Sequence, residues 1–90
     1  MIEETNLLSS YLVQRQRFYD LLYSIQEKYL QWFTERESVN GQQHPSLVRD
    51  YVDCNLDLST RVPKLKYNPD LDSNILEECS DAFCVAFDLS

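Results

Sequence analysis

The sequence predicts an all-α fold in which a long N-terminal helix packs with two shorter helices, as a helical hairpin followed by a third helix. The prediction rests on a long run of apolar residues spaced three and four apart, on a single glycine, and on only three prolines in 90 residues. An all-β chain of this length would need many tight turns and therefore more glycine. We expect one helical domain over residues 1–90.

The first predicted helix covers residues 5–37. One face has the alternating three- and four-residue spacing of a coiled-coil seam, with one charged interruption. This seam consists of Leu8, Tyr11, Arg15, Phe18, Leu22, Ile25, Tyr29 and Trp32. A second apolar row extends the same side and consists of Leu12, Tyr19, Tyr23, Leu30 and Phe33. The apolar face is therefore wider than a two-stranded coiled coil requires, and is typical of a helix in a bundle.

The second predicted helix covers residues 45–58. Asn40-Gly41 suits the turn before it, and Pro45 suits its first position. Its apolar side consists of Leu47, Val48, Tyr51, Val52 and Leu58. Another side has aspartates spaced three and four apart, which form an acidic stripe of Asp50, Asp53 and Asp57.

Residues 59–68 have no helical period and contain Pro63, so we expect an extended link that forms either a short edge strand or a crossing connection. The third predicted helix covers residues 69–87, or begins only at Asn74. Asn68-Pro69-Asp70 favours the earlier start, because it offers a cap, a proline and an acidic residue in that order. The aromatic and β-branched end, "FCVAFDLS", leaves a terminal strand as the alternative for the last turn.

The length of the first helix predicts a dimeric bundle. A helix of roughly 33 residues spans about 50 Å, whereas a compact domain of this size has a radius of gyration near ~12 Å. Two short helices are not expected to cover so broad an apolar face, so we predict a homodimer through this helix. Arg15 either pairs with an acidic group across that interface and sets its register, or extends its stem to solvent where the helix leaves the core.

The net charge of −7 is concentrated at the C-terminal end, where six acidic residues and no lysine or arginine follow Tyr67. Such a chain disfavours direct nucleic-acid binding and favours a protein partner with a basic surface. No stretch is long enough for a membrane span, and the N-terminus lacks the basic start of a signal peptide. Three cysteines, an odd number, are then expected as reduced thiols in the cytoplasm.

Reactive residues are few, so we predict no catalytic, cofactor or metal site. His44 and the three cysteines could formally supply a zinc set, but no two cysteines have the close spacing of structural zinc ligands. Buried thiols on apolar helix faces explain them better. Gly41 alone cannot build a phosphate-binding loop.

The predicted function is that of a small acidic, non-enzymatic protein–protein interaction module, which would act as an adaptor, assembly factor or regulator. Tyrosine favours interfaces because it buries area and keeps a wettable hydroxyl. The residues predicted to bind the partner are Arg15, Tyr19, Tyr23, Asp50, Asp53, Asp57, Glu77, Glu78 and Asp81. The alternative is an acidic inhibitor whose carboxylates mimic nucleic-acid phosphates toward a nucleic-acid-binding protein.

Overall fold

The computed structural model describes the backbone of residues 2–40 and 47–89, and the side chains of residues 6–36 and 47–89. Its elements are α1 (Ile2–Lys28), α2 (Leu30–Asn40), the short 3₁₀-helix η1 (Val48–Asp50), β1 (Val52–Asp57), β2 (Val62–Tyr67) and α3 (Ser73–Ala86). The two strands pair as an antiparallel hairpin. The all-α prediction is therefore wrong, because the fold is mostly helical but includes a small sheet.

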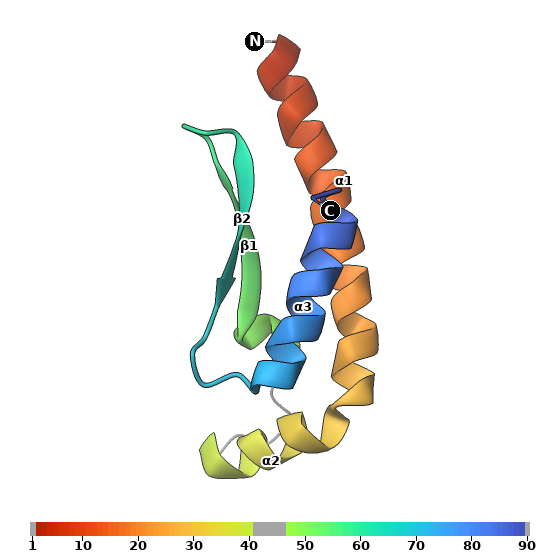
Figure 1. Ribbon diagram of the computed structural model, residues 1–90, viewed down its shortest axis with the longest axis vertical. Helices are drawn as coiled ribbons and strands as arrows, with labels where there is room; N and C mark the ends of the chain where they lie inside the picture. The colour runs from red at the N-terminus through yellow and green to blue at the C-terminus, as the bar shows by residue number, and fades with distance from the viewer. Residues whose placement is uncertain (1, 41–46, 90) are drawn as a thin grey trace.

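The helices α1 and α3 lie side by side and antiparallel, the hairpin runs along them, and α2 crosses the lower end of the molecule (Figure 1). The first turns of α1 extend past the end of α3, beside the loop of the hairpin (Figure 1). The molecule is therefore elongated, with extents of 47 × 24 × 20 Å and a radius of gyration of 14.6 Å.

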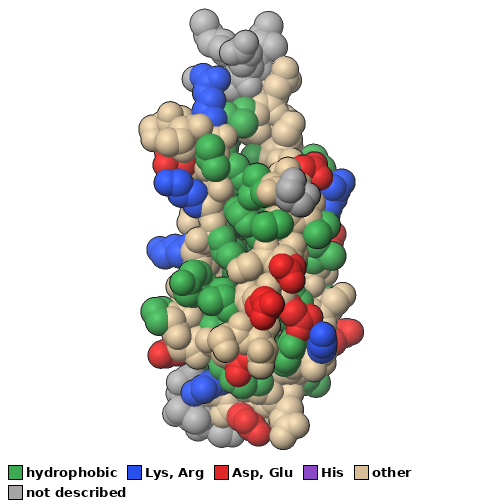
Figure 2. Space-filling model, in the orientation of Figure 1, with side chains coloured by type: hydrophobic (Ala, Val, Ile, Leu, Met, Phe, Trp, Pro, Cys, Tyr) green, Lys and Arg blue, Asp and Glu red, His purple; other side chains and the backbone are tan. Residues whose placement is uncertain are grey.

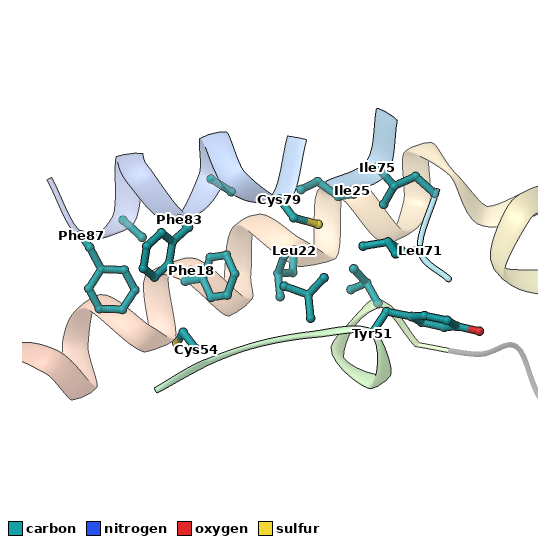
Figure 3. Packing of buried hydrophobic residues seen from close by; sticks show 14 of the residues in the cluster. Phe18, Leu22, Ile25, Tyr51, Cys54, Leu71, Ile75, Cys79, Phe83 and Phe87 are labelled. Atoms are coloured by element: carbon teal, nitrogen blue, oxygen red, sulfur yellow. The ribbon is translucent and has the colours of Figure 1, made fainter. Parts of the chain in front are cut away.

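The core lies between α1, α3 and the hairpin (Figure 3). The side chains buried almost completely there are Phe18, Leu22, Val52, Cys54, Ile75 and Cys79. The ring of Phe18 meets Phe83 of α3 edge to face, with 5.8 Å between the centroids. Apolar seam residues of α1 are thus covered by the same chain, and this part of the face needs no second copy.

The predicted unbroken helix over residues 5–37 is instead two helices that meet at Tyr29. Backbone hydrogen bonds continue across the bend, from the Tyr29 amide to the Ile25 carbonyl at 3.0 Å and from the Phe33 amide to the Tyr29 carbonyl at 3.3 Å. No glycine or proline occurs at the bend. The contacts that favour it are tertiary, because Phe33 is fully buried and Trp32 packs edge to face on Tyr51 at 5.4 Å.

The predicted helix over residues 45–58 is wrong, because its described part forms η1 and β1. Residues 52–57 alternate between apolar and acidic or amide side chains, which is the period of a half-buried strand. Val52 and Cys54 point into the core and are each 1% exposed, whereas Asn55 is exposed to solvent. Burial of these alternate positions against α1 and α3 decides the conformation in favour of the strand.

The hairpin loop is organised by Asp57. Its carboxylate accepts hydrogen bonds from the Ser59 amide at 2.9 Å and the Ser59 hydroxyl at 2.6 Å, and pairs with Lys64 of β2 at 3.1 Å. The loop returns to β2 through Arg61, whose φ of 59° lies in the left-handed region. Residues 62–67 of the predicted link therefore form the second strand of the hairpin.

The third helix begins at Ser73, close to the later of its two predicted starts. Asp72 caps it by accepting hydrogen bonds from the amides of Asn74 and Ile75. The earlier start, with Asn68 as the cap before Pro69, is instead a turn, in which the Asn68 side chain accepts from the Asp70 amide at 2.8 Å. The helix runs to Ala86, so the terminal strand considered for its last turn does not form.

Candidate functional site

A polar cluster joins α1 to β1 at the border of the core. The Tyr19 hydroxyl accepts a hydrogen bond from Arg15 Nε at 2.8 Å and donates one to Asp53 at 2.5 Å. The guanidinium of Arg15 also lies 3.9 Å from Asp53. Arg15 therefore contacts an acidic group of its own chain, on β1. One of the two predictions for Arg15 was an acidic contact across a dimer interface.

The same cluster includes a buried thiol. The Tyr11 hydroxyl donates to the Cys54 carbonyl at 3.1 Å and lies 3.9 Å from the Cys54 sulfur. Burial, together with Cys54, raises the pKa of Tyr11 to about 12, and burial also raises the pKa of Cys54. Burial and the hydrogen bond to Asp53 raise the pKa of Tyr19. These groups stay protonated at neutral pH, which makes them poor nucleophiles.

A second polar contact ties the end of α1 to α3. Lys28 pairs with Glu78 at 2.9 Å, and the Tyr29 hydroxyl donates to the other oxygen of Glu78. The hydrogen bonds from Tyr29 and Lys28 lower the pKa of Glu78. Glu78, predicted to bind a partner, therefore makes intramolecular contacts that hold α3 beside the bend.

The surface of α1 next to the hairpin keeps an apolar row that the core covers only in part. We define this apolar row as Leu8, Leu12, Tyr19 and Tyr23, whose helical spacing puts them on one side of α1, followed by Leu30, the first residue of α2. Their side chains remain accessible, with exposed fractions of 57% for Leu12, 73% for Tyr23 and 50% for Leu30. Of the second apolar row of the sequence, Leu12, Tyr23 and Leu30 thus remain exposed, whereas Tyr19 is half-buried against the core and Phe33 is buried by the bend.

A groove of about 170 Å³ opens beside this row, between α1 and η1. Its lining residues are Tyr19, Leu22, Tyr23, Gln26, Leu47, Val48 and Arg49. The side chain of Gln26 accepts a hydrogen bond from the Val48 amide at 2.6 Å and so holds η1 against α1. Leu47 is 52% exposed at the rim, so the groove presents apolar surface to solvent.

Arg49 is the charged residue of the groove. Its guanidinium lies 4.0 Å from the centre of the Tyr19 ring, and Arg15 lies 4.9 Å from the same ring. Unlike Arg15, Arg49 forms no ion pair with any residue in the described part of the chain. Stacking on the ring holds the guanidinium in place and leaves its N–H groups available to an acceptor.

The predicted acidic stripe does not form one surface for a partner. Asp50 accepts from the Leu47 amide at 3.1 Å, Asp53 belongs to the cluster with Arg15 and Tyr19, and Asp57 organises the hairpin loop. The hydrogen bonds from Ser59, followed by the pairing with Lys64, lower the pKa of Asp57. All three carboxylates therefore serve local structure.

An acidic face remains on α3. We define it as Glu77, Asp81 and Val85, which are all exposed and follow one another at intervals of one helical turn. Asp88, just beyond the end of α3, is also exposed. Figure 2 shows acidic side chains over α3, whereas lysine and arginine side chains line the edge of the molecule at the hairpin. Glu77 and Asp81 form no ion pair with other described residues, so this face is a free acidic surface.

The structure thus brings Arg15, Tyr19 and Asp53 together and places Tyr23 in the wall of the adjoining groove. Sequence reasoning missed Leu47 and Arg49, because it assigned them to a helix. The signal that pointed to this surface was the width of the apolar face beyond the seam.

No group of three or more histidine, cysteine or acidic side chains among the described residues is arranged to hold a metal ion. His44, considered with the cysteines as a zinc set, lies outside the described residues. Within residues 2–40 and 47–89, no helix combines the length and apolarity needed to cross a membrane. Comparison with protein families, with curated proteins and with solved structures finds no match.

Proposed function

We propose that this protein is a small non-enzymatic protein–protein interaction module, acting as an adaptor, assembly factor or regulator. The partner docks on the apolar row of α1 and inserts a side chain into the groove beside Tyr23. The observation that carries the proposal is the exposure of Leu12 and Tyr23 next to a groove with apolar walls. Exposed apolar surface that adjoins a concavity and a tyrosine is typical of binding sites.

The leucines of the apolar row on α1 contribute little to the core. The core already uses the seam of α1, and Leu12 leaves more than half of its side chain in water. Complete burial of a leucine side chain contributes about 1.5–3 kcal/mol, so a partner that covers Leu12 and Leu8 gains a favourable contribution that folding leaves unused. Val13, also exposed on α1, lies on the other side of the helix, away from the groove.

The partner in this proposal can also be a second copy of the chain, in a homodimer through α1. The contact would then be made by the apolar row, because the seam is covered by the rest of the same chain. The free acidic face of α3 suits a basic surface on a partner. Three free cysteines support a reducing, cytoplasmic compartment. The phosphate-mimic alternative is not favoured, because Asp50, Asp53 and Asp57 are held in local contacts.

The test is capture of partners from an extract of the source cells by three tagged proteins. The wild type is compared with a Leu12→Ser, Tyr23→Ala double variant and with a Val13→Ser control. These side chains are all more than half exposed, so thermal unfolding should be nearly unchanged in both variants. We expect the double variant to lose a partner that the wild type and the control retain. Equal recovery by all three proteins would refute docking on the apolar row.

A further inference from the structure

We propose that the groove receives the acidic face of α3 from a second copy of this chain. The inference rests on the proposed function and names the partner of the same site. A single chain carries both complementary surfaces: an apolar groove with a guanidinium, and an exposed helix face that combines an apolar side chain with carboxylates, neither of which forms an ion pair within the described part of the chain.

The groove selects its ligand by shape and charge. Its walls are apolar at Leu22, Leu47 and Val48, and Arg49 is its charged lining residue. A guanidinium without an ion pair favours a carboxylate, to which it can donate two parallel hydrogen bonds. The best ligand is therefore an aliphatic or aromatic side chain that has a carboxylate close to it.

The acidic face of α3 has this chemistry. Val85 is 61% exposed, and Asp81 precedes it by one helical turn, so both lie on the same side of α3. Glu77 lies one further turn away, and Leu89, which is 46% exposed, follows the helix. Val85 in the groove would place Asp81 close enough to reach Arg49.

The same chain cannot make this contact with itself. Ile75, Cys79 and Phe83 hold the opposite face of α3 against the core, so the acidic face points to solvent. The groove lies on the hairpin side of α1, where η1 and not α3 forms its second wall. The contact therefore joins two copies through two different surfaces, and its repetition gives either a reciprocal dimer or an open chain.

Charge makes the association weak and dependent on concentration. Each copy has a net charge of −7, so the copies repel at long range, while Arg49 and Asp81 attract at contact. We expect monomers at ~10 µM and a measurable fraction of larger species approaching ~1 mM.

The experiment is sedimentation equilibrium over this range with two complementary charge-reversal variants. Arg49→Glu spoils the groove, and Glu77→Arg with Asp81→Arg spoils the α3 face. All three side chains are exposed, and Arg17→Glu on another side of α1 is the matched control. Each spoiled variant should self-associate about tenfold or more weakly than the wild type and the control.

Mixing the two spoiled variants gives the decisive result. The α3 variant still has an intact groove and the groove variant still has an intact α3 face, and the reversed charges of the two altered surfaces also attract each other, so an equimolar mixture should regain the association that each variant has lost. A wild type that stays monomeric at ~1 mM, or spoiled variants that associate like the wild type, would overturn the inference. The capture test of the proposed function is independent of this experiment. If self-association fails but the Leu12→Ser, Tyr23→Ala variant alone loses a captured partner, the protein that binds the apolar row and groove is a different protein and not a second copy.

Discussion

The bend between α1 and α2 predicts that Phe33→Ala strongly destabilises the monomer. Phe33 is fully buried, and its ring packs on Trp32 at 5.0 Å and on Tyr51 at 6.1 Å. Removing a buried phenylalanine side chain costs about 3–5 kcal/mol, through lost apolar burial and the cavity left behind. We expect a value near ~3 kcal/mol, because Phe33 packs at the end of the domain where the structure can partly relax.

The matched control is Leu30→Ala on the same helix, three residues earlier. Leu30 is 50% exposed, so its truncation should lower the free energy of unfolding by less than about 1 kcal/mol. For a domain of this size a loss of ~3 kcal/mol lowers the Tm by roughly 12–24 °C. Circular dichroism at two protein concentrations measures both effects.

Two outcomes would refute the reasoning about the bend. If Phe33→Ala were as mild as Leu30→Ala, Phe33 would not be buried in solution. If the loss of unfolding free energy depended on protein concentration, Phe33 would pack in an interface between two copies and not on Tyr51 of its own chain. That result would favour an unbent helix over residues 5–37.

The polar contacts give two predictions of pH dependence. The pKa of Tyr11 is raised from 10.0 to about 12, so between these pH values the native state keeps a proton that the unfolded chain loses. The free energy of unfolding should therefore fall as the pH rises from 10 to 12. In alkaline denaturation, Tyr11→Phe should reduce the slope of this fall. The pKa of Asp57 is lowered below its ordinary 3.8 by Ser59 and then Lys64, so its stabilising effect is present above that pH and is lost as the pH falls through the lowered pKa. Asp57→Asn should therefore flatten the acid limb of a urea-stability profile, and an unchanged profile would contradict the loop geometry.

Much of α1 could be predicted from the sequence, because the spacing from Tyr11 to Ile25 is regular and its apolar residues, Tyr11, Phe18, Leu22 and Ile25, face the core. The bend could not be predicted in the same way. Residues 26–36 contain no glycine or proline, and the contact that favours the bend comes from Tyr51, distant in the sequence.

The hairpin was missed for two physical reasons. Aspartates at 50, 53 and 57 fit a helix period, whereas Asp53 and Asp57 also lie on one side of a strand. The usual signal of a hairpin, glycine or asparagine in the left-handed position, is absent because Arg61 occupies it. Only the tertiary burial of Val52 and Cys54 separates the two interpretations.

The site was predictable in part. The width of the α1 face drew attention to Tyr19 and Tyr23, and an acidic partner across a dimer interface was one of the two alternatives for Arg15. Its partner is Asp53 of the same chain, which sequence reasoning had placed on another helix. The groove itself required η1 to pack on α1, and a short 3₁₀-helix leaves no periodic signal in a sequence.

Site-specific photo-crosslinking tests the docking surface most directly. A benzophenone amino acid replaces Leu12 in one protein and Val13 in another, so that two exposed positions about 100° apart around α1 report on different sides of it. We predict that the probe at position 12 crosslinks to a second copy or to another protein, and that the probe at position 13 does not. Equal yields at both positions, or no product from position 12 at concentrations where the protein associates, would contradict the assignment of the apolar row as a binding surface.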